Sequence, residues 1–156
     1  RFMFRLDVSS PSAEDLTRIL ANTTGNKQVS MTAQITADEL HQLQILVREV
    51  LCGSHLTRFV AELVVATHPE NSANDDATKR FVRYGASARA GQAILLGAKA
   101  RALLAGRPAV VQEDIDACLL PALKHRVLLG FEADAEQIGV TDLLHEWQHT
   151  AQRLAH

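Results

Sequence analysis

The chain has 156 residues, of which 47% are hydrophobic, 22% are charged and 4% are aromatic, and its net charge is -2. This balance excludes a disordered chain, and it lacks the positive charge typical of nucleic-acid-binding proteins, so we expect no nucleic-acid partner. No run approaches the ~18 apolar residues that a membrane span requires, and the start does not resemble a signal peptide. We therefore expect a cytoplasmic protein without a membrane span, in which Cys52 and Cys118 are reduced thiols.

The first residues predict a short strand followed by a helix. Apolar residues alternate with other side chains over residues 2–8, which is the period of a strand, and Ser12 then caps a helix with an apolar stripe. We expect residues 1–27 to be the trailing edge of a larger domain and residues 28–36 to be a linker. A strand without a neighbouring strand leaves its backbone N–H and C=O groups unpaired. We therefore expect residues 2–8 to be disordered, packed on the helices or exchanged between chains.

Residues 37–156 predict an all-helical bundle of four to five helices. The first helix follows a capping box formed by Thr36 and Glu39, and Gly53 closes it. Ser54 is the predicted cap of the second helix.

The second helix stops at Pro69, and residues 70–79 lack helical periodicity, which predicts a solvated loop. The third helix begins at Ser87 and ends near Gly106. The fourth runs from about Gln112 to Gly130.

The fourth helix contains Pro121, where we expect a bend, and a final helix begins near Thr141. The predicted fold is mainly α, a strand–helix segment followed by the helical bundle.

The segment from Gly85 to Arg89 is the first candidate site. Ser87 is a good helix N-cap, and it places Arg89 in the first helical turn, where a cation opposes the helix dipole by a few tenths of a kcal/mol. A bound anion would remove this conflict, since free backbone N–H groups and a guanidinium hold phosphate together. The alternative is a solvated or ion-paired arginine.

Several segments at consistent spacing resemble MoxR-type AAA+ ATPases. The Arg-Phe pair at the start, with Pro11-Ser12 after it, is similar to the end of the family's core domain. Residues 82–90 resemble its sensor-2 motif, usually Gly-Ala-Ser-Pro-Arg. Three further segments resemble the conserved stretches that follow this motif in the family; they are residues 98–107, 113–115 and 123–129.

The resemblance implies a role for each matching residue. Arg89 would be the sensor-2 arginine that contacts the ATP phosphates from a helical lid, with Ser87 and Gly85 in the same motif. Arg1 would be an arginine finger that completes a neighbouring subunit's site in trans. The family also implies Mg²⁺ with the ATP, a hexameric ring, and chaperone-like remodelling of a client, often beside a protein with a von Willebrand factor A domain.

Two departures from the family pattern affect helix starts, not phosphate contacts. Ala88 replaces the usual proline, and Val111-Gln112 stands where Thr-Pro is common. The sequence has no GxxxxGK[ST] loop and no strand that ends in Asp-Glu. We therefore expect this fragment alone not to hydrolyse ATP, although the full-length protein would be an ATPase.

Two other functions remain open at this point. His145, Glu146 and His149 form an HExxH sequence, which on a helix would place two zinc ligands one turn apart beside a general base. A zinc hydrolase needs a third ligand, and neither usual downstream position supplies one, so we expect no metal site unless another histidine approaches. The second alternative is a helical adaptor that docks on another protein. It requires that the helix end carrying Arg89 is covered, so that no nucleotide can reach it.

Overall fold

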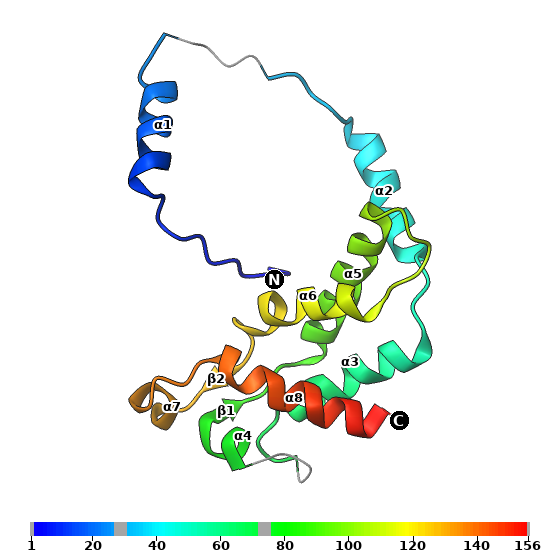
Figure 1. The fold of residues 1–156 in the computed structure, drawn as a ribbon. Coiled ribbons are helices and arrows are strands. Elements are labelled where there is room, and N and C mark those ends of the chain that lie inside the picture. Colours follow the sequence, from blue (N-terminus) through cyan, green and yellow to red (C-terminus); the bar gives the residue numbers. More distant parts are fainter. Residues whose placement is uncertain (1, 27–30, 72–75, 156) are drawn as a thin grey trace.

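The computed structural model describes residues 2–26, 31–71 and 76–155, and this part of the chain is mainly helical, as predicted (Figure 1). The elements in chain order are α1 (Ala13–Thr23), α2 (Ala37–Glu49), α3 (Ser54–Ala66), α4 (Asp76–Phe81), β1 (Val82–Tyr84), α5 (Ala88–Leu104), α6 (Gln112–Leu123), β2 (Leu128–Leu129), α7 (Phe131–Ala135) and α8 (Val140–Ala155). The small antiparallel sheet of β1 and β2 was not predicted.

The first described residues form no strand, so the prediction of a strand over residues 2–8 was wrong. They run as an extended segment whose backbone bonds to the helices, the second of the three predicted outcomes. The Arg5 N–H donates to the Pro121 carbonyl at 2.9 Å, and the Arg126 guanidinium donates to the carbonyls of Phe2 and Met3. The segment thus satisfies part of its backbone without a neighbouring strand.

Two of the predicted helix caps, at Ser12 and Thr36, form side-chain hydrogen bonds. The Ser12 hydroxyl accepts from the Asp15 N–H at 3.1 Å and starts α1. Thr36 and Glu39 form the reciprocal capping box of α2, with the Thr36 hydroxyl accepting from the Glu39 N–H at 3.2 Å.

The boundary between α2 and α3 lies earlier than predicted. Helix α2 ends at Glu49 because Val50 adopts extended backbone (φ -55°, ψ 130°), and Leu51 then pairs with Ala109 in an isolated parallel bridge. Gly53 therefore does not close α2; it is the N-cap residue of α3, so the predicted cap at Ser54 was wrong by one residue. This bridge joins segments far apart in the sequence, so local caps could not reveal it.

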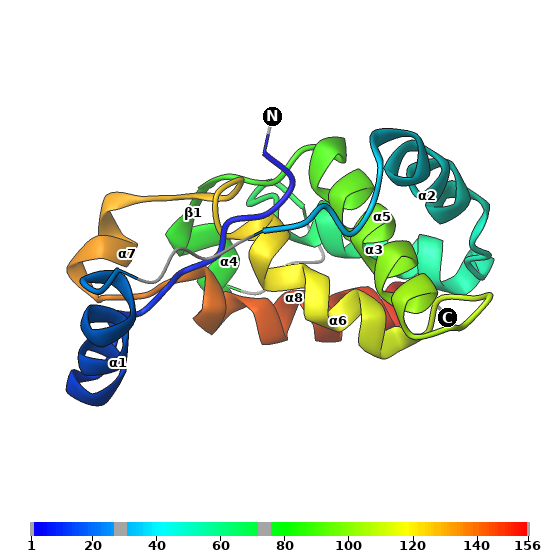
Figure 2. The same ribbon diagram turned by 90° about the horizontal axis from the view of Figure 1, so that it is seen from above.

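The hydrophobic core lies where α3, α5, α6 and α8 pack together (Figures 1 and 2). Its largest fully buried side chains are Trp147, Leu63, Ile94, Ile115, Leu119 and Leu123. Small buried residues of α5 let the neighbouring helices approach it closely; they are Ala90, Ala93, Gly97, Ala98 and Ala102. The one polar atom of the buried tryptophan ring is satisfied, since Nε1 of Trp147 donates to the Thr78 hydroxyl at 2.9 Å.

Two further predictions were wrong around the small sheet. The expected loop of residues 70–79 contains the start of α4 at Asp76, and residues 72–75 lie outside the described residues. Helix α6 ends at Leu123 instead of running to Gly130, and residues 128–129 pair with β1. Strands of two or three residues are too short to show a period of two.

Candidate functional site

The candidate site is the beginning of α5. Ser87 is its N-cap residue (φ -83°, ψ 172°), and Arg89 lies in the first turn, as predicted. The Ser87 hydroxyl makes no capping hydrogen bond, and within the described chain the N–H groups of Ala88 and Arg89 donate to no backbone oxygen of a turn or loop. The helix therefore begins with unused donors, which carry the positive end of its dipole.

Arg89 is exposed, and it makes no hydrogen bond or ion pair with any residue that the structure describes. The first turn of α5 also contains no acidic residue. The ion-paired alternative for Arg89 is thus absent from the described part of the chain. A guanidinium and free N–H groups at one helix end are a suitable arrangement for a phosphate.

Gly85 is required by a close approach between two segments. A Cβ atom at this position would lie 2.7 Å from Cγ of His68 and 2.8 Å from the backbone oxygen of Thr67. Any larger residue would push the turn before α5 away from the end of α3. Gly85 was predicted as a site residue from the motif. Its lack of a side chain allows the turn before α5 to lie close to the end of α3.

Ala86, which follows Gly85, is held by Thr67 and His68, the two residues that directly follow α3. The Thr67 hydroxyl accepts from the Ala86 N–H at 2.8 Å, and Nε2 of His68 donates to the Ala86 carbonyl at 2.8 Å. Both polar groups of one peptide residue are therefore fixed just before the N-cap. Sequence reasoning missed these two positions because they precede Ala86 by 19 and 18 residues, with no local pattern linking them.

The other side of the turn is held by the small sheet. Strand β1 pairs with β2 in the register Val82 with Leu129 and Tyr84 with Leu128, and the Gly130 N–H donates to the Phe81 carbonyl at 2.8 Å. The segment that leads into α5 is consequently supported by two elements distant in sequence.

The far end of α5 is fixed by an ion pair. The guanidinium of Arg107 binds both carboxylate oxygens of Asp114 at 2.7 Å, and Asp114 also accepts from the Val111 N–H at 3.1 Å. The hydrogen bonds from Arg107 lower the pKa of Asp114 below its ordinary 3.8, although burial of the carboxyl opposes this shift. Asp114 thereby compensates for the missing side-chain cap at Val111.

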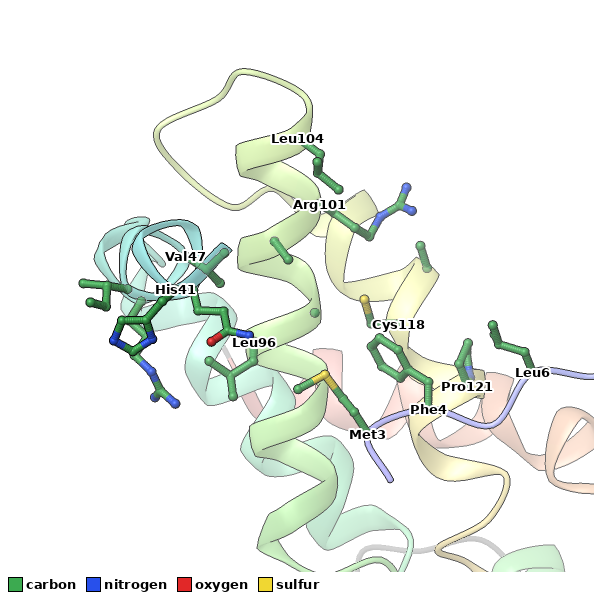
Figure 3. A pocket seen from close by; sticks show the side chains of 16 residues that line it. Met3, Phe4, Leu6, His41, Val47, Leu96, Arg101, Leu104, Cys118 and Pro121 are labelled. Carbon is green, nitrogen blue, oxygen red and sulfur yellow. The ribbon is translucent and has the colours of Figure 1, made fainter. Parts of the chain in front are cut away.

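Two grooves border opposite halves of α5. A groove of about 570 Å³ lies beside its start and is lined mainly by residues of α3 and α5, together with His68 and Ser87. A second groove of about 770 Å³ lies between α2, α6 and the later half of α5. Figure 3 shows Met3 and Phe4 of the N-terminal segment against this second groove, with the Phe4 ring beside Cys118. Among the described residues, the predicted site residues Gly85, Ser87 and Arg89 do not line the second groove.

The residues of the HExxH sequence lie on α8 and not at the start of α5. Arg1 lies outside the described residues. His145, Glu146 and His149 lie on the exposed face of α8, while Trp147 between them is buried. Over residues 2–26, 31–71 and 76–155 no three His, Cys, Asp or Glu side chains gather in a way that could hold a metal ion. The zinc hydrolase alternative therefore lacks its third ligand in this part of the chain.

The described helices and cysteines bear on two further expectations. No helix in the described ranges is both long and apolar enough to cross a membrane. Cys118 is buried, which raises the pKa of its thiol, and Cys52 is half-buried; neither forms a disulfide.

Comparisons with known proteins agree with the predicted resemblance and with the fold. A family model described as the AAA lid domain matches residues 74–147. Chaperone MoxR1 of Mycobacterium tuberculosis is 28% identical over 88% of the chain and 36% of its own length, and Protein MoxR of Paracoccus denitrificans is 31% identical over 83% and 42%. A Cytophaga hutchinsonii crystal structure, called a "putative ATPase", superposes with a TM-score of 0.88 over 96% of this chain and 46% of that one, at 24% identity.

The chain spans less than half the length of each of these relatives. The likeness to the solved structure establishes the fold, and the family model covers the segment from α4 to Trp147 of α8, which contains Arg89. The chain is thus similar to the MoxR-type AAA+ ATPases over most of its length, and residues 74–147 match the AAA lid domain.

Proposed function

We propose that this chain is the nucleotide-sensing lid segment of a MoxR-type ATPase and that Arg89 contacts the phosphates of ATP. The observation that carries this proposal is the first turn of α5, which contains an exposed arginine without a described partner and two backbone N–H groups without a described acceptor. The position matches the sensor-2 motif of the family that the chain resembles. No described residue covers Arg89, whereas the adaptor alternative requires this helix end to be blocked.

The proposed mechanism divides the work between the lid and the core of the full-length protein. ATP and Mg²⁺ bind in a core domain, and the lid closes so that the Arg89 guanidinium and the first turn of α5 meet the phosphates. These groups stabilise negative charge without needing to reorganise, because the helix end is already formed. The fragment alone is inactive in this proposal, since the phosphate-binding loop and the Asp-Glu strand end are absent from its sequence.

Assembly and remodelling follow from the family resemblance. Arg1 would complete a neighbouring subunit's site, which requires head-to-tail contacts that close into a ring, in this family a hexamer. Rigid-body motion of the lid would then couple ATP turnover to the remodelling or assembly of a client, with a von Willebrand factor A domain protein as a partner.

The test is ATP turnover by the full-length protein with Arg89→Ala. A charge-assisted contact to phosphate contributes about 1.5–3 kcal/mol, so turnover should fall about 10- to 100-fold while the unfolding temperature stays unchanged. Arg89→Lys should be intermediate, because lysine keeps the charge but loses the planar fork. Arg153→Ala, an exposed arginine on α8, is the matched control. Wild-type turnover in Arg89→Ala would remove the proposed role.

A further inference from the structure

Ala86 is held on both sides by the end of α3. Its N–H and its carbonyl bond to Thr67 and His68, respectively, each at 2.8 Å, and Gly85 beside it has no space for a Cβ atom. Ala86 and Thr67 are fully buried, while His68 is partly buried. The turn before α5 is thus fixed by specific hydrogen bonds as well as by packing.

The orientation of the two side chains is also fixed. The Thr67 hydroxyl donates to the Val64 carbonyl at 2.7 Å, so its lone pairs remain to accept from Ala86. The other ring nitrogen of His68, Nδ1, lies 3.2 Å from a carboxylate oxygen of Glu70, which orients the imidazole. Each holding group is therefore itself held by a second contact.

The held residue directly precedes the N-cap of α5, and Arg89 follows within the first turn. A shift of Ala86 would move the free N–H groups and the guanidinium together, because helix α5 continues rigidly from this point. Displacements of about 1 Å at a phosphate contact are enough to lower catalytic rates strongly.

We propose that Thr67 and His68 are positioning residues for Arg89, which fix the start of α5 in the direction that meets the nucleotide phosphates. This inference rests on the proposed function of Arg89. It assigns to the end of α3 a role in ATP turnover that acts only through α5.

The first test is a double-mutant cycle in the full-length protein. Thr67→Val keeps the side-chain shape and removes the hydroxyl, so kcat/KM for ATP should fall about tenfold. In the Arg89→Ala background the same substitution should change kcat/KM clearly less, because the guanidinium is gone and only the backbone N–H groups remain to be positioned. Thr78→Val is the matched control, since Thr78 is also a buried threonine whose hydroxyl accepts a hydrogen bond from another element. It should lower the unfolding temperature without this coupling.

The second test uses His68 and does not depend on how well Thr67→Val folds. His68→Gln keeps a donor near the position of Nε2 and should retain most of the turnover, whereas His68→Phe should lose about as much as Thr67→Val. Rescue by the conservative variant separates hydrogen bonding to Ala86 from filling of space.

The outcomes separate this inference from the proposal on which it rests. Wild-type turnover in Arg89→Ala would overturn both. A strong effect of Arg89→Ala together with equal effects of Thr67→Val in both backgrounds would overturn only the positioning role, and so would equal turnover in His68→Gln and His68→Phe. Coupling between Thr67 and Arg89 with rescue by His68→Gln would confirm it.

Discussion

Helices α2 and α3 each have 13 residues, and each carries apolar side chains, but their surroundings differ completely. Helix α3 lies between α5 and α8 and buries six of its residues, which are Leu56, Phe59, Val60, Leu63, Val64 and Ala66. Among the described helices, α2 packs substantially only against α5, and it has no buried residue. Helix α1 likewise has no buried residue and stands apart from the helical body in Figure 1.

The difference shows that an amphipathic pattern specifies a helix but not the partner of its apolar face. Most of the stability of a protein helix comes from tertiary packing of that face. We therefore expect the free energy of unfolding of this chain to reside in the body from α3 to α8. The segment before it, residues 2–49, should contribute little except where it contacts the body.

The largest effect should come from a core substitution in the body. Leu119 of α6 is fully buried, so Leu119→Ala should lower the free energy of unfolding by about 3 kcal/mol. Leu43 of α2 is 44% exposed, and Leu43→Ala is the matched control, with a loss below about 0.5 kcal/mol. Urea unfolding of the chain followed by circular dichroism measures both. Equal losses would show that α2 has a packing partner that the comparison overlooks.

A smaller effect should come from the ion pair between Arg107 and Asp114. Asp114 is 2% exposed and accepts from both Arg107 and Val111, so Asp114→Asn should lower the free energy of unfolding by on the order of 2 kcal/mol. Glu113→Gln, a neutralised carboxylate in the same helical turn, is the control. An unchanged stability in Asp114→Asn would mean that the pair does not hold α6 to the end of α5.

The same pair predicts a pH dependence. Since hydrogen bonds from Arg107 hold the pKa of Asp114 below 3.8, its contribution is present above pH 3.8 and is lost as the pH falls through the folded-state pKa. The difference in stability between the wild type and Asp114→Asn should therefore shrink as the pH falls below 3.8. A difference that stays constant into that range would contradict the ion pair as its cause.

The smallest effect should come from the contact between the N-terminal segment and the body. The Phe4 ring packs against Gly97 and Cys118, so Phe4→Ala should cost about 1 kcal/mol through lost apolar burial. Gly97→Ala should expel the ring, because a Cβ atom there would clash with it. Both variants should speed limited proteolysis within residues 2–10, whereas Phe2→Ala, at an 83% exposed side chain, should not. Unchanged cleavage would mean that backbone bonds alone hold the segment.

Local signals predicted much of this fold and the centre of the site. The caps at Ser12 and Thr36, and the start of α5 after Ser87, depend on residues within one helical turn, and the structure confirms all three positions. Arg89 could be singled out because a cation in a first helical turn has no local reason to be there.

The features that the sequence did not predict depend on distant partners. The two short strands form because residues 82–84 and 128–129 meet across the fold, and α2 ends early because Leu51 pairs with Ala109. The hold of Thr67 and His68 on Ala86 is of the same kind. No periodicity or cap within one segment could have indicated any of them.

The most direct test of the central claim, that the start of α5 meets the nucleotide phosphates, is hydrogen exchange in the full-length protein with and without saturating Mg²⁺ and a non-hydrolysable ATP analogue. The amides of Ala88 and Arg89, which have no acceptor within the described chain, should become protected when the nucleotide binds. The start of α8 at Val140 should exchange at the same rate in both states. Unchanged exchange at Ala88 and Arg89 with the nucleotide bound would contradict the account.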